Sequence, residues 1–533
     1  MQGFSHVELL LLALILLVAT FAVIAKWLTT PYPIILVIGG LLLSLIPAAP
    51  RVVLNPSVVF FVFLPPLLFS AAFQTSWRDF RRNLPSILML AFGLVAFTVF
   101  GVAAGIRWIV PGFDWRLGMV LGAVVATTDP ISAAATARRL GIPQVITDLL
   151  EAESLVNDGS GLVALKFTAA LLVTGKTPSV LEGVGELLYL IFFGIAIGLC
   201  VGKVIQFVQS KISEASIEIT ISLITPYIAY LTAESAHCSG VMATLACGIF
   251  LGRRSYGFYS LNARIDSTAV WRTLDFILNG VVFLVLGLQL PAMLSEIRGM
   301  SVAGLLWTAS CFTLLVIALR LLWVYPSAWL VQRFTNTGGA SSSILFTPRA
   351  IFIVGWSGMR GVLALAAAFS LPETLNDGTP FPHRNLIIFF TFCVIFVTLV
   401  LQGLTLPPLI RRLGLSAATH AEREEQLARR EMITAALREL DKIRESNAEG
   451  EARTFDHLSG FYQRRLALLE EGDGSVSESA TRAQIAKHEQ IAQQLRSIER
   501  NVALRLRNEN KIHDEVWRHL ERELDLLDAR FHP

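Results

Sequence analysis

The chain has 533 residues, of which 54% are hydrophobic and only 16% carry a charge, and its net charge is +3. Soluble globular proteins carry about 25% charged residues, so this composition excludes an ordinary soluble protein and predicts a membrane protein. The charge is unevenly spread: residues 1–412 are net basic, whereas residues 413–533 are slightly acidic. Five scattered cysteines fit neither a metal site nor a disulfide framework, and we interpret them as small buried hydrophobic residues.

An apolar stretch of about 20 residues crosses the hydrocarbon core of a bilayer. The first such stretch, Val7–Ala25, lacks a clear cleavage site, so we predict a membrane helix there instead of a signal peptide. By this measure the sequence predicts an all-α polytopic membrane protein with about thirteen spans. They lie near residues 7–26, 33–48, 53–73, 84–110, 116–138, 146–173, 186–209, 217–233, 238–252, 267–291, 302–331, 349–371 and 385–410.

Lysine and arginine residues cluster after the odd-numbered spans, for example at Arg78, Arg81 and Arg82, and are sparse after the even-numbered ones. By the positive-inside rule this pattern places the N-terminus outside and the C-terminal part in the cytoplasm. We expect a multi-pass protein of the cell membrane, with a bacterial inner membrane as its setting. Residues 413–533 are rich in Ala, Glu, Arg, Leu and Gln at helical spacing, with a break at Gly472–Ser475. They predict a cytoplasmic helical or coiled-coil tail that binds a regulator or mediates self-association.

The fifth predicted span is interrupted in its middle by Asp129-Pro130. Proline suits the first position of a helix and aspartate the N-cap, so two half-helices are predicted, one ending near Ala126 and one starting at Pro130. A plain proline kink is the alternative interpretation. The twelfth span has a matching glycine-rich break, Gly355–Gly361, that contains Arg360. Paired broken helices predict a transporter site built on inverted repeats.

The sixth span carries Glu153, Ser154, Asn157 and Asp158. Ionisable groups inside a membrane span by default mark an ion or proton pathway. Glu153 is a candidate partner for Arg360, in a structural ion pair that leaves Asp158 free to exchange a cation for a proton. Oxygen ligands from Asp129, Asp158, Ser154 and Thr128 suit Na⁺ or Li⁺. Arg320 also lies deep in an apolar span, without an assigned partner.

Several of these segments resemble the monovalent cation:proton antiporter family of sodium/proton exchangers of the bacterial NhaP-like type. They are Leu64–Phe69, Thr128–Pro130, Glu153–Gly159, Gly355–Gly361 and Gln402-Gly403, in this order along residues 5–412.

The resemblance implies a homodimer whose ion-carrying core, here residues 84–173 and 302–412, moves like an elevator against a dimerisation domain. It also implies that Asp158 carries the ion and proton, that Thr128, Asp129, Ser154 and Asn157 contribute to the site, and that Glu153 and Arg360 form a stabilising ion pair. An Asn-Asp pair at residues 157–158 implies electroneutral exchange. Family members often have an acid where this chain has Ser70.

The leading hypothesis is therefore a secondary antiporter exchanging Na⁺ or Li⁺ for H⁺, without a cofactor. A K⁺/H⁺ antiporter of the same fold is the alternative, and a cation channel or a membrane sensor acting through the tail belongs to a different class. No nucleophile-and-base pattern predicts an enzyme, and neither a phosphate-binding loop nor a nucleic-acid partner is predicted.

Overall fold

The computed structural model describes most of residues 6–414 and parts of the tail. The described residues are 6–28, 30–46, 59–129, 142–174, 180–289, 301–334, 345–375 and 379–414, with 430, 433–442, 459–460, 462–463, 502, 505 and 509 in the tail. The chain divides into two compact units, Met1–Ala418 and Thr419–Pro533. In the second unit residues 433–442 are helical, and most of the predicted tail helices, with the Gly472–Ser475 break, lie outside the described residues.

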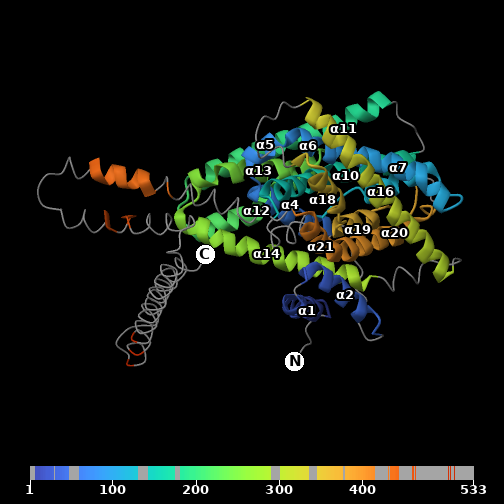
Figure 1. The fold of residues 1–533 in the computed structure, drawn as a ribbon, viewed down its shortest axis with the longest axis horizontal. Helices are drawn as coiled ribbons and strands as arrows, with labels where there is room; N and C mark the ends of the chain where they lie inside the picture. The colour runs from blue at the N-terminus through green and yellow to red at the C-terminus, as the bar shows by residue number, and fades with distance from the viewer. Residues whose placement is uncertain are drawn as a thin grey trace, which may run out of the picture. The chain divides into compact units, whose positions relative to one another are not determined.

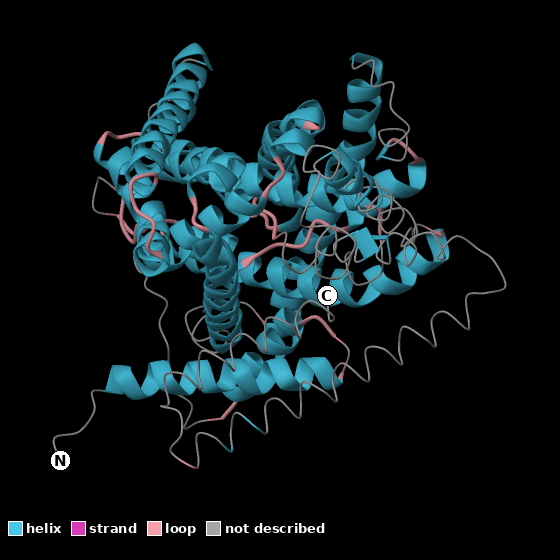
Figure 2. Cartoon of the chain, turned by 90° about the vertical axis from the view of Figure 1, so that its left-hand side faces the viewer, coloured by secondary structure: helices cyan, strands magenta, loops and turns pink. Residues whose placement is uncertain are grey.

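The first unit is helical wherever it is described, apart from turns, loops and one isolated β-bridge between Thr374 and Pro380 (Figures 1 and 2). Its helices are α1 (His6–Trp27), α2 (Tyr32–Ser44), α4 (Leu64–Gln74), α5 (Trp77–Arg82), α6 (Leu84–Leu88), α7 (Leu94–Ile109), α8 (Trp115–Val124), α10 (Gln144–Thr174), α11 (Val180–Gln209), α12 (Ala215–Ser235), α13 (Gly240–Phe258), α14 (Leu261–Leu288), α16 (Val302–Phe334), α18 (Pro348–Trp356), α19 (Val362–Phe369), α20 (Arg384–Val397) and α21 (Gly403–Leu413).

Among the described residues, seven helices are long and apolar enough to cross a membrane. They cover Leu84–Ile109, Val145–Val173, Gly185–Gln209, Ala215–Ser235, Asn262–Leu288, Ala303–Phe334 and Arg384–Leu413. Other predicted spans fall on shorter apolar helices, such as α2 and α8. The prediction of an all-helical, multi-pass membrane protein is confirmed in this form.

Three short π-helical segments adjoin the helices: Val59–Phe63, Met89–Gly93 and Thr398–Gln402. The first lies just before Pro65 and Pro66, which cannot donate a backbone hydrogen bond. The carbonyl of Val62, four residues before Pro66, instead accepts a hydrogen bond from the Tyr227 hydroxyl at 3.1 Å. A side chain on α12 thus satisfies a backbone group that a proline leaves open.

The helices that carry the predicted site pack together at the centre of this unit. Helix α10 contacts α8, α18 and α19, and α16 packs along α7, α18 and α20 (Figure 1). Helix α8 is almost completely buried, which requires small residues where it meets α7. The interrupted helices are therefore enclosed by other helices, which is the one setting in which broken backbone is tolerated at membrane depth.

Candidate ion-binding site

The structure describes one predicted interruption in full and the first half of the other. Helix α8 ends at Val124, and the backbone from Val125 to Asp129 is not helical. Residues 130–141 lie outside the described residues, and with them the half-helix predicted to start at Pro130. The second interruption separates α18 from α19 at residues 357–361, as the glycine-rich break predicts.

The two interruptions cross each other directly. The backbone N–H of Asp129 donates a hydrogen bond to the carbonyl of Met359 at 2.8 Å. A Cβ at Gly361 would lie 2.8 Å from the Cβ of Asp129, so the close approach requires glycine at this position. Unwound backbone from the two halves of the chain is thus paired at one point, and Asp129, with 7% of its surface exposed, lies at that point.

The carbonyls left open at the end of α8 are bound by Arg360. Its Nη1 donates to the carbonyls of Ala126 and Thr127, the latter at 3.0 Å. The Arg360 backbone N–H donates to the Thr398 hydroxyl at 3.1 Å, which fixes the loop that presents the guanidinium. A cation at the C-terminal end of a helix is favoured by the helix dipole. Arg360 therefore lies at the C-terminal end of a half-helix.

The predicted ion pair between Glu153 and Arg360 is wrong. Glu153 instead binds Arg320 of α16 through two parallel bonds, from Nη1 to Oε1 at 2.7 Å and from Nη2 to Oε2 at 2.9 Å. Both side chains are buried. A guanidinium fork matches a carboxylate in this bidentate arrangement, and desolvated charges need such complete pairing.

Arg320 also satisfies the end of α18. Its Nε donates to the carbonyl of Gly355 and its Nη2 to that of Val354, both at 3.1 Å. A Cβ at Gly358 would lie 2.1 Å from Nε of Arg320, so glycine makes room for the guanidinium. Each interrupted helix therefore has its C-terminal carbonyls bound by a buried arginine: Arg360 for α8 and Arg320 for α18. The depth of Arg320 in an apolar span was the sequence signal for this role.

The polar groups of α10 face the unwound backbone after α8. The hydroxyls of Thr128 and Ser154 lie 2.9 Å apart, and Nδ2 of Asn157 donates to the Thr128 hydroxyl at 3.3 Å. All three residues are buried. These contacts bring three of the predicted site residues together, and their binding of an ion stays a prediction.

Asp158 lies next to this cluster. It follows Asn157 on α10 and lies one helical turn after Ser154, so it shares a face of the helix with that serine. Oδ1 of Asp158 is buried without a hydrogen-bond partner, and so is Oδ1 of Asn157. Buried oxygens normally have a partner. Buried oxygens of Asn157 and Asp158 without a partner, on the helix whose Ser154 hydroxyl meets that of Thr128, make a suitable site for a small cation or a proton.

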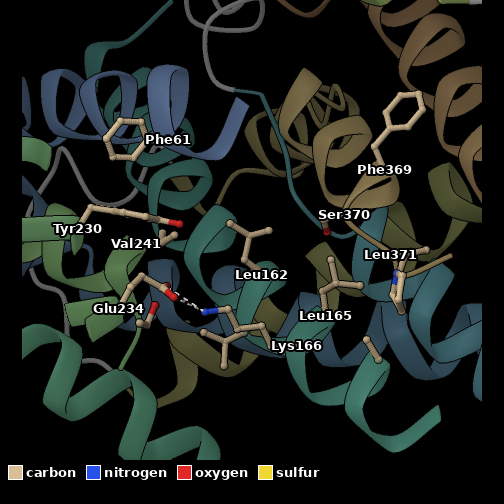
Figure 3. Close-up of a pocket in the computed structure, with 14 residues that line it drawn as sticks. Phe61, Leu162, Leu165, Lys166, Tyr230, Glu234, Val241, Phe369, Ser370 and Leu371 are labelled. Atoms are coloured by element: carbon tan, nitrogen blue, oxygen red, sulfur yellow. Dashed lines mark hydrogen bonds and ion pairs between the residues drawn. The ribbon is translucent and has the colours of Figure 1, made fainter. Parts of the chain in front are cut away.

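A cavity of about 580 Å³ opens beside the same helix, beginning one turn beyond Asp158 at Leu162 and continuing to Ala169. Its lining combines α10 with Tyr230 and Glu234 of α12 and the end of α19 (Figure 3). At its edge Nζ of Lys166 binds Oε1 of Glu234 at 2.9 Å. Lys166 therefore forms an ion pair between α10 and α12.

The sequence profile of the family described as "Sodium/hydrogen exchanger, transmembrane" matches residues 12–412 of this chain. The chain belongs to this family. It is a multi-pass membrane transporter of the cation/proton antiporter class and not an enzyme. All the residues assembled above, from Thr128 to Thr398, fall within the matched region.

Curated relatives of the exchanger support the same assignment. A Mycobacterium tuberculosis protein named "Uncharacterized Na(+)/H(+) exchanger" is 33% identical over 513 residues, which cover 93% of this chain and 91% of the relative. The Bacillus subtilis "Sodium, potassium, lithium and rubidium/H(+) antiporter" is 33% identical over 422 residues, covering 75% of this chain and 61% of that protein. The solved structure of the sodium proton antiporter MjNhaP1 from Methanocaldococcus jannaschii matches this chain with a TM-score of 0.58 at 19% identity. The match covers 76% of this chain and 97% of the MjNhaP1 chain, and it shows that the two share a fold.

Proposed function

We propose that the exchanger moves Na⁺ or Li⁺ in one direction and H⁺ in the other by letting the two compete for Asp158. The observation that carries this proposal is the buried Oδ1 of Asp158, which has no hydrogen-bond partner although it lies in the enclosed crossing of two interrupted helices. A carboxylate at this depth is costly unless a proton or a cation neutralises it. Either ion leaves the site with the same charge, so exchange on this carboxylate alone is electroneutral.

The donor atoms around Asp158 support a small alkali cation. Carboxylate and hydroxyl oxygens of Asp129, Thr128 and Ser154 are hard ligands that require neither nitrogen nor sulfur. Asn157 donates its amide to Thr128 and contributes no charge. A neutral amide at position 157 next to the carboxylate at position 158 therefore supports a one-for-one exchange.

Access from the two sides would alternate by movement of the core, residues 84–173 and 302–412, against the remaining helices of a homodimer. We place the N-terminus outside and the tail in the cytoplasm, as the distribution of lysine and arginine indicates. With this topology the cavity at Lys166 opens outward. Leu162, the α10 lining residue nearest in sequence to Asp158, is one turn from it, which supports entry of an external proton from this side.

The test is Na⁺-driven proton movement in proteoliposomes with a pH-sensitive dye, with the membrane potential free or clamped. Wild type should exchange Na⁺ and Li⁺ for H⁺ at a rate that clamping does not change, and Asp158→Asn should be inactive. Asp114→Asn is a matched control because this carboxylate is exposed at the start of α8. Normal exchange by Asp158→Asn would place the site elsewhere, and a current without proton counter-transport would favour a channel.

K⁺/H⁺ exchange is the second candidate function. It is favoured by the name of the B. subtilis relative, which includes potassium, and by the serine at position 70, where family members often have an acid. Comparing K⁺ with Na⁺ as the driving cation in the same vesicles decides between them. A protein lacking residues 413–533 should keep exchanging, whereas a sensor acting through the tail would lose its function.

A further inference from the structure

A second carboxylate in the membrane region has no neutralising partner. Asp275 of α14 accepts a hydrogen bond from the Ser70 hydroxyl of α4, from Oγ to Oδ2 at 2.5 Å. The other oxygen, Oδ1, is buried and has no hydrogen-bond partner. Among the residues that the structure describes, no lysine, arginine or histidine nitrogen forms an ion pair with it. Arg272, one turn earlier on the same helix, has an exposed side chain.

The surrounding groups orient this carboxylate without neutralising it. Nε2 of Gln74 donates to the Ser70 hydroxyl at 3.0 Å, and Nδ2 of Asn279 donates to the Asp275 carbonyl at 2.8 Å. Ser70 and Asn279 are buried, whereas Gln74 is the exposed last residue of α4. The carboxylate thus lies about one helical turn from the end of α4, among side chains that offer only neutral oxygens and amides.

The geometry places the Asp275 carboxylate where an acidic side chain from position 70 would end. In a glutamate, each carboxylate oxygen lies roughly 2.4 Å from Cγ, as ordinary bond lengths and angles require. The Ser70 Oγ occupies the Cγ position of such a side chain, and Oδ2 of Asp275 lies 2.5 Å from it. The Asp275 carboxylate of α14 therefore provides at this point the negative charge that α4 lacks.

Helix packing connects this carboxylate with the helix that carries Asp158. Asp275 is followed on α14 by Phe276, on which Tyr32 of α2 packs, with ring centroids 5.7 Å apart. Helix α4 itself contacts both α14 and α10. The helix that carries Ser70 therefore packs against the helix that carries Asp158 as well as against the helix that carries Asp275.

We propose that Ser70 and Asp275 form a second binding point for the transported monovalent cation, on the α4–α14 interface, which sets cation affinity and selectivity. An unpaired carboxylate within a membrane span is costly, and a cation that enters between α4 and α14 removes the cost. Oδ1 of Asp275, the Ser70 hydroxyl and the neighbouring amide oxygens supply hard ligands. In the topology proposed above, the exposed end of α4 faces the cytoplasm, so this point loads the outgoing cation. The inference rests on the proposed function.

The experiment compares Asp275→Asn, the double variant Ser70→Glu/Asp275→Asn and the control Asp114→Asn, by Na⁺, Li⁺ and K⁺ titration of exchange in proteoliposomes. Loss of the charge at 275 should raise the apparent KM for Na⁺ by about tenfold, with a maximal rate within about twofold of wild type. Moving the charge to position 70 should restore the KM to within about threefold of wild type, and the control should match wild type.

An unchanged KM in Asp275→Asn would overturn the inference, as would a failure of Ser70→Glu to restore it in a protein that elutes as a single folded species. A fall in maximal rate without a change in KM would assign Asp275 a structural role and would also overturn it. Asp158→Asn is measured alongside. If that variant exchanges normally, the proposed function fails, independently of what the Asp275 titrations show.

Discussion

The assignment of Glu153 to Arg320 instead of Arg360 makes a quantitative prediction. The N–O distances of 2.7 and 2.9 Å in the Glu153–Arg320 pair place the charge centres roughly 4 Å apart, which corresponds to about 4 kcal/mol of attraction at an effective dielectric constant of about 20. Removing one partner leaves the other charge buried and unpaired. We therefore expect Glu153→Gln or Arg320→Gln alone to lower the free energy of unfolding by about 3–5 kcal/mol.

The assay is equilibrium unfolding of the purified, detergent-solubilised protein, arranged as two double-mutant cycles. The cycle of Glu153→Gln with Arg320→Gln should give a coupling energy above about 2 kcal/mol. The reason is that the second substitution removes the buried charge that the first one left without a partner. The cycle of Glu153→Gln with Arg360→Gln should give less than about 1 kcal/mol, because the Arg360 guanidinium binds the Ala126 and Thr127 carbonyls. A larger coupling in the second cycle would refute the pairing described here.

Three further results are expected. Gly358→Ala should lower the free energy of unfolding by about 1–3 kcal/mol and impair transport, because its Cβ would overlap the Arg320 guanidinium. The control Gly355→Ala should lower the free energy of unfolding less in the same denaturation assay, because its Cβ would meet the flexible end of a leucine side chain at 2.9 Å. Lys166→Gln should change the free energy of unfolding by less than about 1 kcal/mol, because the Lys166–Glu234 pair is partly solvent-exposed; a larger loss would show that the pair is a structural requirement. If proton and cation compete for one carboxylate, acidification should raise the apparent KM for Na⁺ and leave the maximal rate at saturating Na⁺ unchanged. Na⁺ titrations at several pH values measure both quantities. A fall in maximal rate at constant KM would contradict competition.

Much of the site could be predicted from the sequence because the bilayer makes polar residues conspicuous. Asp129, Glu153, Asp158 and Arg360 stand in apolar stretches where each is costly. The Asp-Pro pair and the glycine-rich run at 355–361 are local signals of a helix break. Proline cannot donate the backbone hydrogen bond of a helix, and glycine allows backbone conformations that other residues rarely adopt. The break between α18 and α19 and the contacts among Thr128, Ser154 and Asn157 are present as those signals predict.

Only the tertiary structure decided which arginine pairs with which carboxylate. Arg320 and Arg360 are both buried cations in apolar spans, and nothing in their local sequence tells which of them reaches Glu153. The crossing of the interrupted helices places one guanidinium on the carbonyls after α8 and the other on the carboxylate. Ser70 and Asp275 are 205 residues apart, and their contact depends on how α4 packs on α14. Composition and spacing determine that a residue is buried and charged, but the identity of its partner is a property of helix packing, which brings together residues that are distant in the chain.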